Sequence, residues 1–276
     1  MEKIIWVISS QGVRKEVLDF TCYLARLTRS RLTGLVLDNS AKETPAPQME
    51  RRDYFAATAE PGTDQQILKM DAGQCIRWFE EGCEQRGVRS ETLCLKGEPA
   101  EVVLAESRYA DLVLVDPGCS FKDTDEPLPS SFSRELFARA ECPVIVLPCR
   151  FKGIDEVVFC YDGSRSSVFA MKLFTYLLPQ LSDRKAVVLE VAEAPCPASL
   201  DKEKILDWLK GHYSVVSFEV ETGNAGDELF TYFLRKQNLF IVMGAYGRGR
   251  LSQLFHESSA DRVLRVVNLP LFIAHC

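Results

Sequence analysis

Two apolar runs, Asp111-Leu-Val-Leu-Val-Asp116 and Asn238-Leu-Phe-Ile-Val-Met243, share one pattern, and each is followed by another apolar run. The later runs are Glu141-Cys-Pro-Val-Ile-Val-Leu147 and Asn268-Leu-Pro-Leu-Phe-Ile-Ala274. An offset of 127 residues carries the first pair onto the second without a gap. Self-similarity at a fixed offset indicates a repeated structural unit. The sequence therefore predicts two copies of one fold.

The two halves also begin alike. Trp6-Val-Ile-Ser-Ser-Gln-Gly12 lies opposite Val157-Val-Phe-Cys-Tyr-Asp-Gly163, at the larger offset of 151 residues, so the first half carries extra length. Continuous apolar runs such as Val144-Ile-Val-Leu147 and Ala186-Val-Val-Leu189 indicate strands buried on both faces, as in a parallel sheet covered by helices. Alternation of such strands with helices predicts a doubly wound α/β domain in each half.

The expected domains are 1–150, with a long polar loop at 39–62, and 151–276, with the boundary near 149–153. In the first domain we expect strands at 3–9, 31–38, 88–95, 111–116 and 143–148, and helices at 13–29, 64–86, 99–108 and 131–140. In the second we expect strands at 155–161, 185–192, 214–221, 239–243 and 270–275, and helices at 165–181, 199–211, 226–236 and 252–267.

Composition excludes several classes of partner. The net charge of −6 and the pI near 5.3 provide no bulk attraction to nucleic acid or to anionic lipid. No segment approaches the roughly 18 uninterrupted apolar residues of a membrane-spanning helix. The ten cysteines form no Cys-x-x-Cys pair, and most are interpreted as small buried residues of a protein in the reducing cytoplasm. We expect a cytoplasmic protein without a metal site.

The first candidate site segment is Asp162-Gly163-Ser164, at the end of the second half's first strand. In an open parallel sheet, ligands bind beyond the carboxyl ends of the strands. Asp162 can accept hydrogen bonds from a ribose or an amino group, Gly163 permits a tight turn, and Ser164 can cap the next helix. A simple strand-to-helix turn explains the same three residues.

The second candidate is the glycine loop Gly244-Ala-Tyr-Gly247-Arg-Gly249-Arg-Leu-Ser252, which follows the fourth strand. Glycines expose amide donors, and a helix start beside them makes an anion site. Arg248 and Arg250 add positive charge, and Ser258 and Ser259 can supply hydroxyl groups to a phosphate. The loop is neither a Walker loop nor a dinucleotide fingerprint. A flexible glycine loop without a ligand is the alternative.

These motifs together resemble the universal stress protein family, which has Asp-Gly-Ser after strand one. The family also has Gly-x-x-Gly, nine residues, and Gly-Ser/Thr after strand four. Gly244-x-x-Gly247, nine residues and Glu257-Ser258 match that pattern with one departure. The resemblance covers both halves. It implies two similar five-stranded domains of the adenine nucleotide alpha-hydrolase-like fold, paired through their last strands as a pseudo-dimer.

The resemblance also implies a ligand, ATP or a related adenine nucleotide, with Mg²⁺ as a candidate companion. The implied nucleoside contact is Asp162, and Val191 at the end of strand two would border the adenine through its backbone. Gly244, Gly247 and Ser258 would hold the phosphates. Glu257 puts a carboxylate where the family has glycine. Two like charges about 4 Å apart repel by about 1 kcal/mol in water and by more in a drier pocket.

The first half departs further from the family pattern. Gln11 stands where Asp162 does, and Asp116-Pro117-Gly118 stands where Met243-Gly244-Ala245 does. Pro117 lacks an amide donor, and Asp116 adds negative charge. We therefore expect a structural or regulatory first half. A cation site formed by Asp116, Asp123, Asp125 and Glu126 is the alternative to a solvated acidic loop, although their spacing is not that of an EF-hand.

Three hypotheses for function follow. The first is a stress-response or signalling protein that binds an adenine nucleotide in the second half. The second is a nucleotide-free interaction scaffold in which both sites are degenerate. The third is an enzyme, either a slow ATP hydrolase or a relative with adenylate chemistry. Against it stands the lack of a general base paired with a nucleophile in the recognised loop, since adjacent His256 and Glu257 point about 100° apart on a helix. Homodimerisation beyond the internal pairing is left open.

Overall fold

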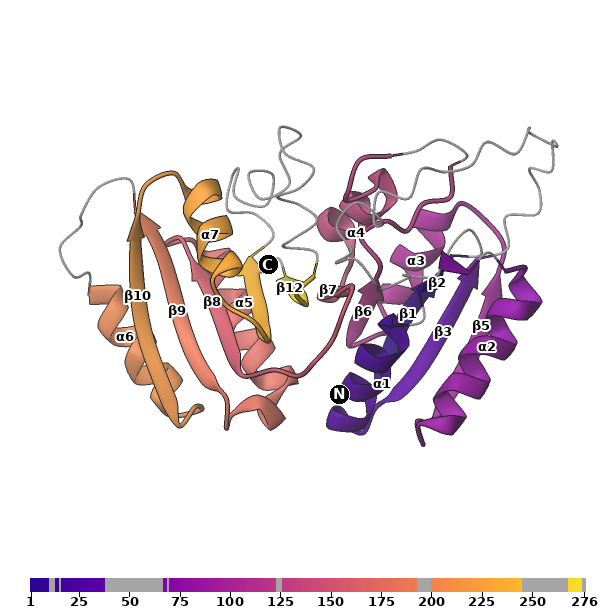
Figure 1. Ribbon diagram of the computed structural model, residues 1–276, viewed down its shortest axis with the longest axis horizontal. Helices are drawn as coiled ribbons and strands as arrows, with labels where there is room; N and C mark the ends of the chain where they lie inside the picture. The colour runs from indigo at the N-terminus through magenta and orange to yellow at the C-terminus, as the bar shows by residue number, and fades with distance from the viewer. Residues whose placement is uncertain are drawn as a thin grey trace. The chain divides into compact units, whose positions relative to one another are not determined.

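The computed structural model describes residues 1–9, 13–14, 16–37, 67–68, 70–122, 126–192, 200–244 and 268–274. Its contacts divide the chain into a first unit, Glu2–Cys142, and a second unit, Pro143–Cys276, with which Met1 is grouped. Strands and helices alternate in each unit (Figure 1). The predicted α/β fold is therefore confirmed.

The first unit contains a parallel sheet with strand order β6-β1-β3-β5. β1 and β3 are buried along nearly their whole length, which explains their continuous apolar sequence. The elements of the first unit are β1 (Lys3–Ile8), β2 (Val13–Arg14), α1 (Val17–Thr28), β3 (Arg31–Leu37), β4 (Ile67–Leu68), α2 (Ala72–Gln85), β5 (Ser90–Leu95), α3 (Pro99–Ser107), β6 (Leu112–Val115) and α4 (Ser131–Arg139).

The second unit repeats this topology with the strand order β10-β9-β8-β11-β12, all parallel. The order reverses direction between β8 and β11, so the domain is doubly wound. The elements of the second unit are β7 (Val144–Val146), β8 (Glu156–Tyr161), α5 (Arg165–Leu177), the 3-10 helix η3 (Pro179–Leu181), β9 (Lys185–Ala192), α6 (Leu200–Lys210), β10 (Val215–Thr222), α7 (Ala225–Leu234), β11 (Leu239–Gly244) and β12 (Leu271–Ala274).

The last strands of the two sequence repeats pair with each other. β7 runs antiparallel to β12, with Val146 opposite Leu271 and Val144 opposite Ile273. Both strands are fully buried and apolar. Since an uncovered apolar edge invites aggregation, this pairing protects both strands. It also explains why β7, the last strand of the first repeat, is assigned by contacts to the second unit.

Phe174 of α5 is the centre of the second unit's core. Its ring lies edge-on to Phe240 of β11 at 4.9 Å, to Phe272 of β12 at 5.2 Å and to Phe159 of β8 at 5.8 Å between centroids. All four side chains are almost completely buried. This cluster packs α5 against three strands. Because α5 follows β8 in the chain, the helix begins at the carboxyl edge of the sheet (Figure 1).

Two predicted helices begin later in the chain than expected. Residues 13–14 and 67–68, predicted as helix, form the short strands β2 and β4, which pair antiparallel with Arg14 opposite Ile67. α2 starts at Ala72, where Asp71 accepts a hydrogen bond from the Gln74 amide and the Gln74 side chain caps the Asp71 amide.

Two parts of the prediction lie outside the described residues, namely the loop at 39–62 and the helix at 252–267. The domain boundary near 149–153 stays a prediction of the sequence repeat. Among the described residues, no helix has both the length and the apolar character needed to cross a membrane.

Candidate functional site

The carboxyl edge of the second unit brings together three of the predicted site residues. β8 lies between β9 and β11, with Tyr161 level with Glu190 and Phe159 level with Val242. Asp162 follows β8, Val191 lies near the end of β9, and Gly244 ends β11. All three therefore stand at one edge, beside the point where the strand order reverses, which is where open α/β sheets bind ligands.

The Asp162-Gly163-Ser164 segment is a tight turn into α5. Asp162 Oδ1 accepts a hydrogen bond from the Ser164 amide at 3.0 Å, and Gly163 has a φ of +76°, which favours glycine. Ser164 Oγ caps the helix by accepting from the Ser167 amide at 3.1 Å. The three residues therefore form the strand-to-helix turn that the sequence offered as one interpretation.

Gly244 is required by close packing. A Cβ at this position would lie 2.5 Å from the carbonyl carbon of Ser166 and 2.7 Å from the Ser167 nitrogen, both backbone atoms in the first turn of α5. The end of β11 therefore touches the start of the helix. A glycine stands here for a reason that does not depend on a ligand, so replacing Gly244 tests packing before it tests binding.

Besides Asp162, which the sequence predicts as a site residue, two further acidic groups, Glu190 and Asp201, act on Tyr161 at this edge. Burial raises the pKa of Tyr161, and the charges of Asp201, Glu190 and Asp162 raise it further. The tyrosine side chain also packs edge-on to Phe218 of β10, with the centroids 6.3 Å apart. The signal was present in the sequence, since Glu190 interrupts the apolar run of its strand.

The phosphate half of the predicted site lies outside the described residues. This applies to Gly247, Arg248, Gly249, Ser258 and Ser259, and also to Glu257. In the part of the chain that the structure describes, no three His, Cys, Asp or Glu side chains gather as metal ligands. Of the cysteines in that part, most are buried, and they are free thiols.

The same edge of the first unit is occupied by an ion pair. Arg14 of β2 donates from Nε to Asp116 Oδ2 at 2.9 Å and also from Nη2 to the same oxygen. Only 3% of the Arg14 side chain is exposed. The pair borders a small hollow, open to solvent, which Trp6, Ser9 and Cys119 also line. Positive charge at this edge is therefore matched by the protein's own carboxylate.

The acidic loop of the first unit is not a solvated loop throughout. Glu126 accepts hydrogen bonds from Ser120 Oγ and Lys122 Nζ, and Asp116 is paired with Arg14. Each of these two carboxylates is therefore engaged by groups of the chain, which argues against the alternative cation site. Asp123 and Asp125, the other proposed ligands, lie outside the described residues.

The fold defines a class of protein, the doubly wound α/β proteins. No protein-family model matches the chain. "Universal stress protein Slr1230" from Synechocystis sp. (strain ATCC 27184 / PCC 6803 / Kazusa) is 29% identical over 133 residues, which are 47% of this chain and 45% of that protein. The match thus spans less than half of that relative's length.

One of the solved structures that the chain resembles shows the same fold. A universal stress protein from Archaeoglobus fulgidus matches with a TM-score of 0.64 at 15% identity, over 98% of this chain and 96% of its own. A universal stress protein family protein from Arabidopsis thaliana with AMP bound reaches a TM-score of 0.35 at 16% identity, over 53% of this chain and 90% of its own. The AMP is a property of that protein.

The chain is therefore similar to universal stress proteins in sequence and has their fold along nearly its whole length. The resemblance that the glycine and Asp-Gly-Ser motifs predicted is confirmed.

Proposed function

We propose that this chain is a stress-response or signalling protein that binds ATP or a related adenine nucleotide at the carboxyl edge of its second unit. The observation that carries the proposal is the convergence of Asp162, Val191 and Gly244 at the ends of three neighbouring parallel strands. The glycine loop continues directly from Gly244. The nucleoside and the phosphates would thus be held by adjacent strand ends.

The charges around the edge support a nucleotide rather than a simple anion. Asp162, Glu190 and Asp201 make the side next to β8 and β9 acidic, as shown by their effect on Tyr161. Ribose hydroxyls and the adenine amino group are hydrogen-bond donors that carboxylates accept well. Arg248 and Arg250, which follow β11 in sequence, supply positive charge for phosphates. A nucleotide, with hydrogen-bond donors on its nucleoside and negative charge on its phosphates, fits this arrangement of acidic and basic residues.

Glu257 is expected to make the affinity depend on the charge of the nucleotide. Its carboxylate stands next to Ser258, the residue proposed to hold phosphate, and would repel a highly charged ligand. Mg²⁺ bound to the ATP phosphates would reduce that repulsion. We therefore expect Mg·ATP to bind more tightly than free ATP.

The test compares a replacement of Asp162 with a control replacement outside the site. Asp162→Asn keeps an oxygen that can accept from the Ser164 amide, so the turn survives while the charge is lost. We expect Asp162→Asn to weaken ATP binding about tenfold or more, as for the loss of a hydrogen bond to a charged group. Asp183→Ala, at an exposed aspartate outside the site, is the control and should bind as the wild type does. Equal affinity of wild type and Asp162→Asn in calorimetry would remove Asp162 from the site.

An interaction scaffold is the second candidate, and two observations favour it. Gly244 is explained by packing against α5, and the Asp-Gly-Ser segment is explained as a helix-capping turn. Both motifs would then persist without any ligand. Stoichiometric adenine nucleotide in the purified protein, released on denaturation and identified by mass, would exclude the scaffold.

A further inference from the structure

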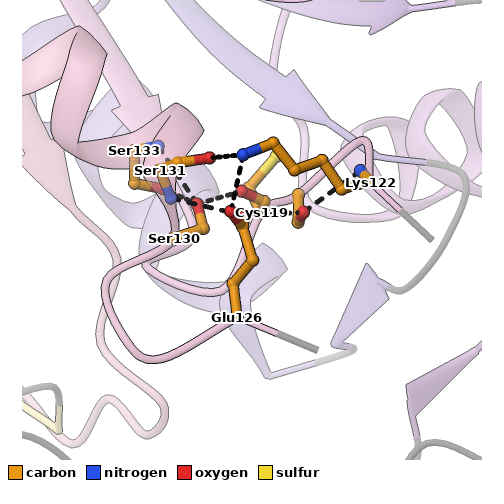
Figure 2. Close-up of polar contacts among 7 residues, drawn as sticks. Cys119, Lys122, Glu126, Ser130, Ser131 and Ser133 are labelled. Carbon is orange, nitrogen blue, oxygen red and sulfur yellow. Dashed lines mark hydrogen bonds and ion pairs between the residues drawn. The ribbon is translucent and has the colours of Figure 1, made fainter. Parts of the chain in front are cut away.

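The carboxylate of Glu126 lies at the start of α4 in a cluster of hydrogen-bond donors (Figure 2). Ser120 Oγ donates to it at 2.9 Å, Lys122 Nζ at 3.0 Å and the Ser131 amide at 3.4 Å. Only 12% of the Glu126 side chain is exposed. We call these four residues the Glu126 cradle.

The cradle is held in place by its own further contacts. Lys122 Nζ also donates to Ser131 Oγ at 2.8 Å, and the Lys122 amide donates to Ser120 Oγ at 3.2 Å (Figure 2). Beside it, Ser130 Oγ caps α4 by accepting from the Ser133 amide at 3.1 Å. The donors are therefore fixed by the loop after β6 and by the first turn of the helix.

This set of donors is chemically an anion site that already contains its anion. A backbone amide at a helix start, a hydroxyl group and an ammonium group are donors that bind phosphates in proteins. Although burial raises it, the hydrogen bonds from Ser131, Lys122 and Ser120 lower the pKa of Glu126 to about 2. The carboxylate is thus charged at any ordinary pH.

The sequence repeat relates the Glu126 cradle to the proposed phosphate site of the second unit. The offset of 127 residues that carries β6 onto β11 also places Ser131 opposite Ser258, the residue proposed to hold phosphate in the second unit. We propose that the Glu126 carboxylate is the built-in anion of the first unit, which takes the place of a ligand phosphate there. The comparison with Ser258 rests on the proposed function, whereas the contacts of Glu126 do not.

The consequence for function is a fixed stoichiometry. Glu126 fills the anion position of the first unit, and the buried pair of Arg14 with Asp116 neutralises the strand ends beside it. Both features keep a negatively charged ligand out of the first unit. One nucleotide per chain, in the second unit, is the result.

The test uses hydrogen–deuterium exchange of the peptide that contains α4, with inorganic phosphate as the probe. Glu126→Ala removes the internal anion, and we expect the α4 amides to exchange roughly tenfold faster in chloride buffer. Added phosphate at equal ionic strength should restore much of the protection by binding in the emptied cradle. Glu135→Ala, which removes an exposed partner of Arg139 on the same helix, is the matched control and should not respond to phosphate.

Glu126→Gln keeps the proposal falsifiable if the alanine variant does not fold. Its amide fills the same volume without the charge, so we expect faster exchange than in the wild type and no effect of phosphate. Unchanged exchange in Glu126→Gln, or failure of phosphate to slow exchange in a folded Glu126→Ala, would overturn the proposal. Unchanged ATP binding in Asp162→Asn, which would count against the proposed function, leaves this result untouched, because the readout is local to the first unit.

Discussion

Adding one methyl group at Gly244 is expected to strain the junction between β11 and α5. The Cβ of Gly244→Ala would lie 2.5 Å from the Ser166 carbonyl carbon and 2.7 Å from both the Ser166 oxygen and the Ser167 nitrogen. These are backbone atoms, so no side chain can rotate away, and the strand or the helix must shift. Overpacking of this kind costs about 3 kcal/mol.

The matched comparison is Gly163→Ala, two residues before α5. Its Cβ would meet nothing within 4 Å, but its φ of +76° is unfavourable for alanine. That strain alone costs about 1–2 kcal/mol. Urea denaturation followed by circular dichroism measures both variants against the wild type. A Gly244→Ala variant as stable as the wild type, or more stable than Gly163→Ala, would refute the close approach of β11 to α5.

Two further predictions concern stability. The folded-state pKa of Glu126, about 2, lies below its ordinary value of 4.5, so its stabilisation is present above pH 4.5 and is lost as the pH falls through 2. At neutral pH the free energy of unfolding of the wild type should exceed that of Glu126→Gln by about 3 kcal/mol. In urea titrations this difference should disappear between about pH 4.5 and pH 2. A difference that does not depend on pH would contradict the prediction. Phe174→Ala should lower the free energy of unfolding by about 3–5 kcal/mol, because it leaves a cavity in the aromatic core. Phe169 lies on the same helix and is 38% exposed, so Phe169→Ala should lower it by less than about 1 kcal/mol. Thermal unfolding of both variants measures this, and equal losses would argue against Phe174 as the core's centre.

Most of the strands were predictable because they are local apolar runs. The repeat predicted strands from 111 and 239, and β6 and β11 begin at Leu112 and Leu239. The strands at 13–14 and 67–68 were missed because β2 and β4 depend on pairing with each other across a long stretch of chain. No local pattern reveals such a pairing, and the prediction joined both segments to the helices that follow them.

The candidate site also contains parts that the sequence predicts and parts that it does not. The turn at Asp162, Gly163 and Ser164 was predictable because its hydrogen bonds join residues two or three apart. The pair of Arg14 with Asp116 was not, since 102 residues separate its members. The acidity of the loop around Glu126 suggested a solvated loop or a cation site, and only the geometry shows Lys122, Ser120 and Ser131 turned toward that carboxylate.

Calorimetric titration of Mg·ATP into the full chain tests the central claim most directly, with Glu257→Gly measured beside the wild type. The account predicts saturable binding of one nucleotide per chain, tighter in Glu257→Gly because a carboxylate next to the phosphates is removed. Two nucleotides per chain would contradict the closed first unit. No binding to either protein would contradict a nucleotide site in the second unit.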